Sequence, residues 1–594
     1  MKNIVAIFFT ILFCLPAWAQ YYLRGEIKDE HNNPLSNVRI LIHSTGYIYY
    51  SGNEGGFGIT LSAPSDSITI TANGFQTFCA RLDANKYQYI TLKLLYTPST
   101  SLPANRLVSF TRNLKQEEWE RWTVGDETYS SLVENEFVPV VKFPETGFAI
   151  NINKASYSNV RRFLNMGSIV PPDAIRIEEM LNYFNFDYTP PVADSNFSFN
   201  SYVSECPWNE DNLLLFLHVC AKKANIENVP PANLVFLIDV SGSMDLPNRL
   251  PLLKSAFKLL VKNLREKDTV SIVVYGSTVG VWMPPTSGGE KEKIMKSIEE
   301  LNPGGATPGE AGIRAAYRLA RSQYIKGGNN RIILATDGDF NVGQSTEEEL
   351  EGLISMYRQS GIYLTCLGVG MGNYKDSKLE VLAKRGNGNF AYLDDEKEGE
   401  KVLMHEFTQT IYAVANDAYL DITFNPDITK DYRLIGFDNK LKALSDTSNQ
   451  IQGGEIGSGH SLVAIFEIHA TSPNPDDLHP GKKGFAKAVL HYKLPNDSLS
   501  RASYYDCKFK LTPFNELPAS FRLASSIVIF GELLKKSKFM QQVNWDDDMQ
   551  LAMECVDQND IIQKEFLTLI DKAKRIYAKE KKRKKSSKPN DSAN

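Results

Sequence analysis

The chain has 594 residues, of which 42% are hydrophobic and 23% are charged, a composition typical of folded domains and not of disordered or fibrous chains. Its 65 basic and 70 acidic side chains give a formal net charge of -5, which argues against a surface built to bind nucleic acid. Because single hydrophobic cores stop growing at roughly 250 to 300 residues, we expect at least two cores and as many as three or four.

The first residues are typical of an export signal. Lys2 is followed by an apolar run over 4–15 and by Ala-Trp-Ala at 17–19, a small-x-small cleavage site. The run is too short for a comfortable membrane span, which needs about 20 residues. We therefore expect residues 1–19 to be a signal peptide and the protein to reach the periplasm or cell envelope, with the outer membrane or the exterior as further destinations. A retained anchor, or lipidation at Cys14, is the alternative.

Residues 20–95 are predicted to form a small all-β domain, because short β-rich runs such as Val38–Ile42 alternate with Gly, Asn and Pro turn signals. Gly25, Pro34-Leu35, Gly55-Gly56-Phe57 and Asn73-Gly74-Phe75 form a pattern that resembles the carboxypeptidase regulatory-like β-sandwich. The resemblance implies a structural or binding module without catalytic residues.

The next two segments have different characters. Residues 96–147 lose periodicity and are predicted to be a linker. Residues 148–229 are predicted to be a compact α+β region that flanks the next domain. Its helices are expected over 156–164 and 175–184, and its strands over 197–203 and 213–219.

Residues 230–416 alternate buried strands with amphipathic helices. Continuous apolar strands separated by helices imply a parallel sheet that is covered on both faces. We therefore predict a Rossmann-like, doubly wound α/β domain. Its strands are expected over 234–240, 270–275, 332–336 and 362–369.

Residues 417–578 are predicted to be β-rich at first and then helical, with helices over 520–535 and 561–578. Residues 579–594 form a basic tail, for which a solvated segment is the expected state and contact with anionic lipid or another polyanion is the alternative. Six cysteines follow the expected cleavage site without any C-x-x-C pair, so most are expected to be buried thiols. A disulfide between Cys206 and Cys220 remains open.

One motif carries chemistry. The apolar strand that ends at Asp239 runs directly into Asp239-Val-Ser241-Gly-Ser243. In an open α/β sheet, ligands bind outside the carboxyl ends of the strands. One carboxylate and two hydroxyls at alternating positions of a tight turn offer the hard oxygen ligands that Mg²⁺ or Mn²⁺ prefers. Thr307, in a glycine-rich loop, and Asp337, at the end of another buried strand, supply two further oxygens.

These five elements resemble a von Willebrand factor type A (VWA) domain with a metal-ion-dependent adhesion site. The resemblance implies that Asp239, Ser241, Ser243, Thr307 and Asp337 are the metal ligands. If these residues only capped the following helix, as Ser and Asp often do, Thr307 and Asp337 would stay unexplained.

Five further segments, 148–163, 171–184, 336–343, 432–436 and 454–460, resemble an exported bacterial VWA family. That resemblance covers about residues 148–578. Asn151 and Asn153 stand at positions where that family has aspartates, which argues against a charge-based role for their segment. Glu310 replaces a neutral turn residue and is expected to cap a helix, with tuning of the metal affinity as the alternative.

The site implies protein binding. A cation held mainly by hydroxyls stays short of negative charge, and we expect a partner protein to fill its open position with an Asp or Glu carboxylate. A partner carboxylate could also tilt the last helix, predicted over 396–412, as in better-known relatives. We expect no catalytic residues, because H-E-x-x-H, G-x-S-x-G and G-x-x-x-x-G-K-[ST] are all missing from the sequence. The remaining alternative is an envelope scaffold with a vestigial metal site, in which the β-sandwich does the binding.

Overall fold

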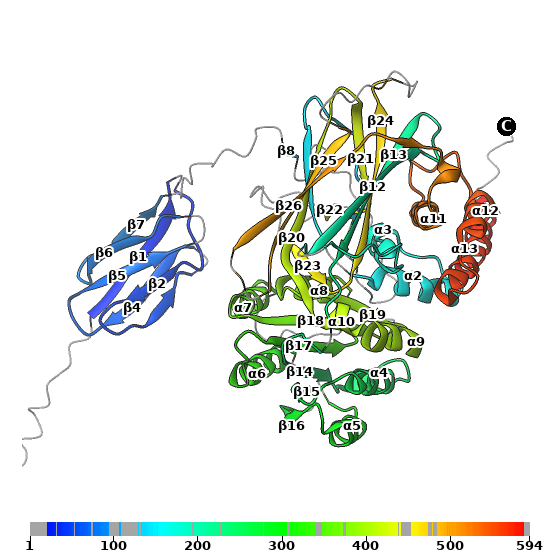
Figure 1. Cartoon of the computed structure of the whole chain (residues 1–594). Helices are drawn as coiled ribbons and strands as arrows, with labels where there is room; N and C mark the ends of the chain where they lie inside the picture. Colours follow the sequence, from blue (N-terminus) through cyan, green and yellow to red (C-terminus); the bar gives the residue numbers. More distant parts are fainter. Residues whose placement is uncertain are drawn as a thin grey trace, which may run out of the picture. The chain divides into compact units, whose positions relative to one another are not determined.

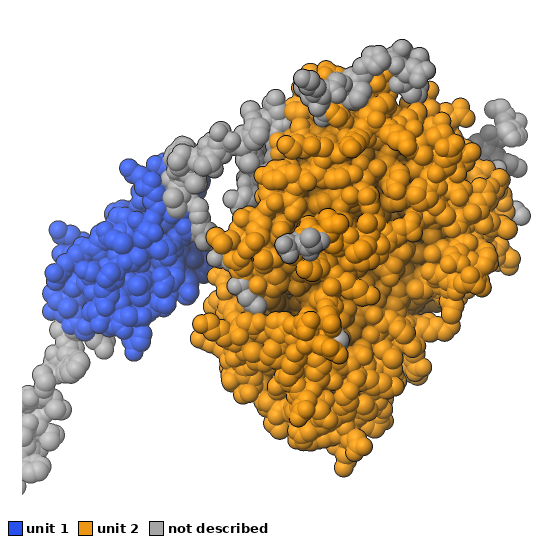
Figure 2. Space-filling model, viewed as in Figure 1, with its two compact units in different colours: residues 1–104 blue, residues 105–594 orange. Residues whose placement is uncertain are grey.

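The computed structural model divides into two compact units, residues 1–104 and 105–594, which Figure 2 colours separately. It describes residues 21–93, 106–107, 127, 129 and 132–586, with gaps at 31, 53, 73–74, 151–152, 193–194, 226, 277, 306–308, 339–346, 372–375, 438, 441–452, 473–477, 479–483, 496 and 498. The predicted signal peptide, residues 1–19, lies outside the described residues.

The first unit consists of two small sheets that share one hydrophobic core. One sheet has the order β4 (Gly56–Leu61), β1 (Tyr21–Asp29), β7 (Gln88–Leu92), and the other has the order β3 (Ile48–Tyr50), β2 (Arg39–Ile42), β5 (Ser65–Thr71), β6 (Phe78–Asp83). Strand β4 alternates exposed and buried residues, as expected of a sheet with one wet face. The all-β prediction for this segment is confirmed.

The second unit contains two six-stranded sheets that enclose a common core. The sheet that we call the middle sheet has the order β10 (Val138–Pro139), β21 (Thr429–Ile435), β24 (Ser461–Ala470), β13 (Asn212–Ala221), β12 (Phe197–Glu205), β27 (Leu511–Thr512). The outer sheet has the order β26 (Ser500–Cys507), β25 (Ala486–Lys493), β20 (Ala413–Phe424), β11 (Glu145–Ala149), β8 (Arg106–Leu107), and β23 (Gly454–Gly457) also pairs with β20.

Helices cover the other face of the middle sheet (Figure 1). They are α2 (Ala155–Asn165), α3 (Ile177–Asn182), α11 (Ala519–Lys535), α12 (Trp545–Cys555) and α13 (Ile561–Ser586). Leu214 and Phe216 of β13 pack among them, whereas Leu215 and Leu217 face the outer sheet. This double coverage explains why every residue of β13 is buried. A search of the described helices finds none that is long and apolar enough to cross a membrane.

The domain boundaries differ from the sequence prediction in two places. Glu127 is 1% exposed and pairs with Arg162 of α2. Strand β10 belongs to the middle sheet, and strand β11 belongs to the outer sheet. Residues 127–147 therefore belong to the second unit rather than to a linker. The segment 148–229 does not form a region of its own, because β12 and β13 complete a sheet whose other central strands, β21 and β24, follow the α/β domain in the sequence.

The α/β domain is an insertion between β13 and β20. Its sheet has the order β16 (Val279–Ser287), β15 (Thr269–Tyr275), β14 (Ala232–Asp239), β17 (Asn329–Thr336), β18 (Ile362–Val369), β19 (Phe390–Leu393), and only β16 is antiparallel to its neighbour. One face is covered by α4 (Leu250–Lys262), α5 (Lys291–Glu299), α9 (Glu396–Glu400), η3 (Lys401–His405) and α10 (Phe407–Ile411). The other face is covered by α6 (Gly309–Ser322), α7 (Glu347–Gln359) and α8 (Asp376–Arg385) (Figure 1). The predicted doubly wound fold is confirmed.

Candidate metal site

The candidate site lies at the carboxyl edge of the α/β sheet, where strand order reverses. Strand β14 is followed in the sequence by β15 on one side, whereas β17 lies on its other side. In open α/β sheets the crevice at such a reversal is the usual ligand position. Asp239 is the last residue of β14, and Asp337 directly follows β17. The fold therefore brings two predicted ligands to the same crevice.

Asp239 is a fully buried carboxylate that accepts hydrogen bonds from neutral donors. The backbone N–H of Ser241 donates to its Oδ1 at 2.9 Å, and the hydroxyl of Thr336 donates to its Oδ2 at 2.7 Å. Burial raises the pKa of Asp239 to about 6, and the neighbouring Asp337 acts in the same direction. The fold thus buries a carboxylate whose negative charge is offset only by neutral hydrogen-bond donors.

The two serines lie beside this carboxylate. The hydroxyl oxygens of Ser241 and Ser243 are 3.1 Å apart, and Ser241 is buried. The motif loop is bound to the glycine-rich loop, because the N–H of Gly242 donates to the carbonyl of Gly305 at 3.0 Å and that of Gly304 donates to Val240 at 2.7 Å. Thr307, two residues further along, lies outside the described residues, so its role as a ligand stays a prediction.

Asp337 has a partner that the sequence interpretation missed. Arg249, at the start of α4, donates from Nη1 to Asp337 Oδ2 at 2.6 Å. A signal for this was available, since a cation is disfavoured at a helix N-terminus. An arginine directly before the apolar run of α4 therefore indicates a specific acceptor nearby.

The residues present fit a divalent cation. Four of the five predicted ligands, Asp239, Ser241, Ser243 and Asp337, gather at one strand edge, and all offer oxygen. A buried carboxylate beside two hydroxyls offers the hard oxygen ligands that Mg²⁺ or Mn²⁺ prefers. The geometry thus favours the metal-site interpretation.

Two other sequence interpretations concern neighbouring residues. Glu310 lies in the first turn of α6 and pairs with Arg314 at 2.7 Å, an i,i+4 contact on its own helix. Asn153 accepts a hydrogen bond from the backbone of Phe390 at 3.0 Å, so its amide supports the start of β19. Asn151 lies outside the described residues.

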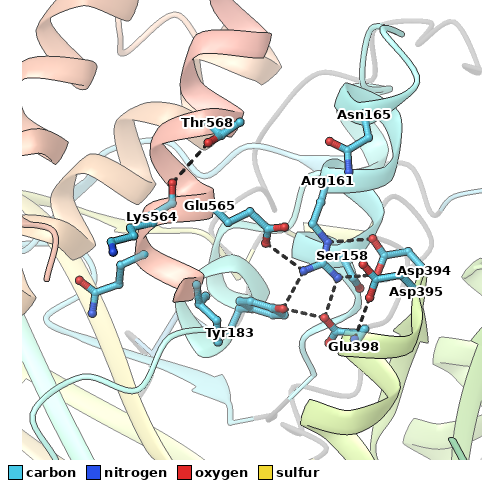
Figure 3. A network of polar contacts seen from close by, with 12 residues as sticks. Ser158, Arg161, Asn165, Tyr183, Asp394, Asp395, Glu398, Lys564, Glu565 and Thr568 are labelled. Carbon is cyan, nitrogen blue, oxygen red and sulfur yellow. Dashed lines mark hydrogen bonds and ion pairs between the residues drawn. The ribbon is translucent and has the colours of Figure 1, made fainter. Parts of the chain in front are cut away.

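The last helical segment of the α/β domain is divided into three parts and is bound to helix α2. The single helix predicted over 396–412 is instead α9, the π-helical turn η3 and α10. Arg161 of α2 binds both the start of this segment and the loop before it (Figure 3). Its guanidinium donates to Asp394 Oδ2 at 2.8 Å, to Glu398 at 2.7 Å and to Tyr183 at 3.0 Å. We call these residues, with Glu565 of α13 at 3.1 Å, the Arg161 cluster.

A second buried contact holds the opposite, amino edge of the sheet. The side chains of Arg331 in β17 and Glu455 in β23 are each 1% exposed and form an ion pair, and Arg331 also donates to Thr365 at 2.7 Å. The Arg161 cluster thus connects the α/β domain to the helices, and the Arg331–Glu455 pair connects it to the outer sheet.

The cysteines are free thiols within the described part of the chain. Cys206 and Cys220 are both buried and do not form the disulfide that the sequence left open. Burial raises the pKa of both thiols.

Sequence comparisons place these parts in known families. Residues 233–408 match the family described as von Willebrand factor type A domain, and residues 123–216 match one described as von Willebrand factor. Residues 409–576 match the family described as the C-terminal part of Uncharacterized protein YfbK. The match that begins at residue 123 agrees with the structural finding that residues 127–147 are not a linker.

Individual relatives cover different shares of the chain. Uncharacterized protein YfbK of Escherichia coli strain K12 is 35% identical over 471 residues, which are 76% of this chain and 81% of that protein. Inter-alpha-trypsin inhibitor heavy chain H2 of Mesocricetus auratus is 29% identical over 182 residues, 29% of this chain but only 18% of that protein. A solved von Willebrand factor type A structure from Catenulispora acidiphila has a TM-score of 0.36 and 15% identity, and covers 63% of this chain and 88% of that one. The chain belongs to the family of bacterial VWA domain proteins that includes YfbK.

Proposed function

We propose that this protein is a non-enzymatic protein-binding module that holds a divalent cation, Mg²⁺ or Mn²⁺, at Asp239, Ser241, Ser243, Thr307 and Asp337. VWA domain proteins commonly mediate protein–protein interaction or adhesion. The observation that carries the proposal is the buried Asp239 carboxylate, whose hydrogen-bond donors are neutral, beside two hydroxyls at the carboxyl edge of the sheet. When bound, the cation would supply an electrophilic position for a carboxylate of the partner.

The roles of the chain's own residues follow from their contacts. Thr336 and the Ser241 backbone orient the Asp239 carboxylate through one hydrogen bond to each oxygen. Ser241 and Ser243 add neutral oxygens, so among these ligands only Asp239 and Asp337 would offset the charge of a bound cation. An acidic side chain of a partner protein is the ligand that such a position favours. We further propose that residues 1–19 direct export, and that the module works in the periplasm or cell envelope.

A second candidate function rests on the first unit. Its surface exposes several large aromatic side chains, among them Tyr22 (59%), Tyr50 (58%) and Tyr89 (77%). Exposed aromatic side chains are enriched at binding surfaces. This favours the alternative in which a carboxypeptidase regulatory-like β-sandwich does the binding and the metal site is vestigial. Partner binding that survives Asp239→Asn but is lost on deletion of residues 20–95 would select this alternative.

The first prediction tests the cation. In EDTA, we expect Asp239→Asn to unfold at the same temperature as the wild type or higher, because the raised pKa of Asp239 means that its ionised form destabilises the metal-free fold above about pH 6. With Mn²⁺ or Mg²⁺ at 100 times Kd, the wild type should gain about 2.7 kcal/mol of unfolding free energy, and Asp239→Asn should gain none. Thermal unfolding by circular dichroism measures both.

Asp268→Asn is the matched control. Asp268 is 1% exposed, lies in the same domain directly before β15, and accepts from the backbone of Ala232 at 2.9 Å, at the amino edge of the sheet. Its substitution should lower the unfolding temperature and leave the response to Mn²⁺ intact. A wild type that shows no cation response, or an Asp239→Asn variant that keeps it, would refute the metal site.

A further inference from the structure

Arg249 connects three strand ends at the candidate site. Its Nη1 donates to Asp337 Oδ2 and to the carbonyl of Ser243, both at 2.6 Å, and its Nη2 donates to the carbonyl of Met371 at 3.0 Å. These acceptors follow β17, β14 and β18. The side chain is 8% exposed, so these contacts are made away from bulk water.

The loop after β18 is shaped around the same guanidinium. Gly370 has a φ of +83°, and a Cβ atom built there would lie 2.6 Å from Arg249 Nε. The carbonyl of Gly370 accepts from Tyr392 of β19 at 2.5 Å. A glycine at this position therefore lets the backbone approach the arginine closely.

The charges at the site explain why an arginine is needed. Asp239 and Asp337 bring two negative charges to one edge, and Arg249 brings one positive charge that is bonded to Asp337. Without a metal ion, the arginine reduces the repulsion between the carboxylates. With a divalent cation present, its charge opposes cation binding and leaves the centre more positive, as a carboxylate-accepting site requires.

We propose that Arg249 is a positioning residue of the metal site: it holds Asp337 and the three strand-end loops together in the metal-free state, and it lowers the affinity of the site for the cation. This inference rests on the proposed function. It adds that cation affinity is set by a cationic side chain of the protein itself, so that a partner carboxylate contributes a larger share of the final binding.

The test is Mn²⁺ binding by the full chain after EDTA treatment and dialysis, read from the electron paramagnetic resonance signal of free Mn²⁺. Arg249→Met removes the charge and keeps most of the length. We expect its Kd for Mn²⁺ to be on the order of tenfold lower than that of the wild type, as for one unit charge near a divalent ion in a partly screened site. In EDTA, Arg249→Met should unfold at a lower temperature than the wild type. At the same Mn²⁺ concentration, its unfolding temperature should rise by more than that of the wild type.

Two further variants separate the effect of the Arg249 charge from the effect of its hydrogen bonds. Arg249→Lys keeps the charge but not the planar fork, so its Kd should stay within about twofold of the wild type while its metal-free unfolding temperature falls. Arg331→Met removes another buried arginine, at the amino edge of the sheet, and should lower the unfolding temperature without changing the Kd.

The outcomes are distinct. A folded Arg249→Met variant with an unchanged or higher Kd for Mn²⁺ overturns the inference and leaves the metal site standing. A wild type that binds no Mn²⁺ overturns the proposed function, and the inference with it. If Arg249→Met does not fold, Arg249→Gln is measured instead, because its amide can still donate a hydrogen bond without a charge, and the same two results decide.

Discussion

Arg161→Met should lower the unfolding free energy of the second unit by about 3 to 5 kcal/mol, because breaking a buried ion pair leaves an uncompensated charge. Asp394 and Glu398 are both nearly fully buried against this one guanidinium. Burial raises the pKa of Asp394 to about 7 even with Arg161 present. Urea-induced unfolding at neutral pH, followed by tryptophan fluorescence, measures the loss.

The pH dependence identifies the cause. Without the arginine, the pKa of Asp394 should rise further, so this carboxylate can take up a proton in the folded state as the pH falls. The loss of unfolding free energy caused by Arg161→Met should therefore be smaller at pH 5.5 than at pH 8. Adding Glu398→Gln to Arg161→Met should recover part of the loss, since one buried charge is then removed.

Arg501→Met is the matched control for this experiment. Arg501 is half-exposed and pairs with Asp497 in the loop before its own strand. Such surface pairs contribute roughly 0 to 1 kcal/mol. A loss for Arg161→Met no larger than that for Arg501→Met would show that the Arg161 cluster does not hold the α/β domain to the helices.

Glu455→Met and Arg331→Met should each destabilise the second unit by a similar amount, about 3 to 5 kcal/mol. Both side chains are 1% exposed, and burial raises the pKa of Glu455 although Arg331 opposes the shift. The double variant Arg331→Met/Glu455→Met replaces the pair with apolar groups, which is often neutral for stability. We therefore expect the double variant to be more stable than either single variant, as denaturant unfolding would show.

Additive losses in the double variant would contradict this expectation. They would mean that each residue acts through contacts other than the pair, such as that of Arg331 with Thr365. The double-mutant cycle isolates the pairwise interaction because the two residues lie in direct contact.

The sequence predicts local structure well where a periodic pattern is strong. Strands β14, β15, β17 and β18 are found within three residues of their predicted bounds, because continuous apolar runs mark strands that are buried on both faces. Strand β16 was missed, since it is an antiparallel edge strand with two bulges and contains Pro284-Pro285. Strand β19 was missed because it has only four residues.

Long-range pairing could not be predicted in the same way. Strand β13 pairs with β24, so that Cys220 lies opposite Ser461 across an inserted domain. No local sequence pattern indicates which distant strand will pair with β13. The strands of the middle sheet that precede and follow the α/β domain in the sequence are therefore predicted as separate regions. The site shows the same division. A local motif predicts Asp239, Ser241 and Ser243, whereas only the fold shows that the acceptor of Arg249 is Asp337.

The insertion of the α/β domain also determines how it would carry mechanical load. The chain enters the domain at the start of β14 and leaves it after α10, where Asn329 at the start of β17 donates to the carbonyl of Ile411 at 2.7 Å. Both connections are thus at the amino edge, and the candidate metal site is at the carboxyl edge. A pull on a carboxylate held there would run lengthwise along β14 and β17. Their parallel hydrogen bonds would then be sheared together instead of being peeled apart one by one, and the Arg331–Glu455 pair would pass part of the force to the outer sheet.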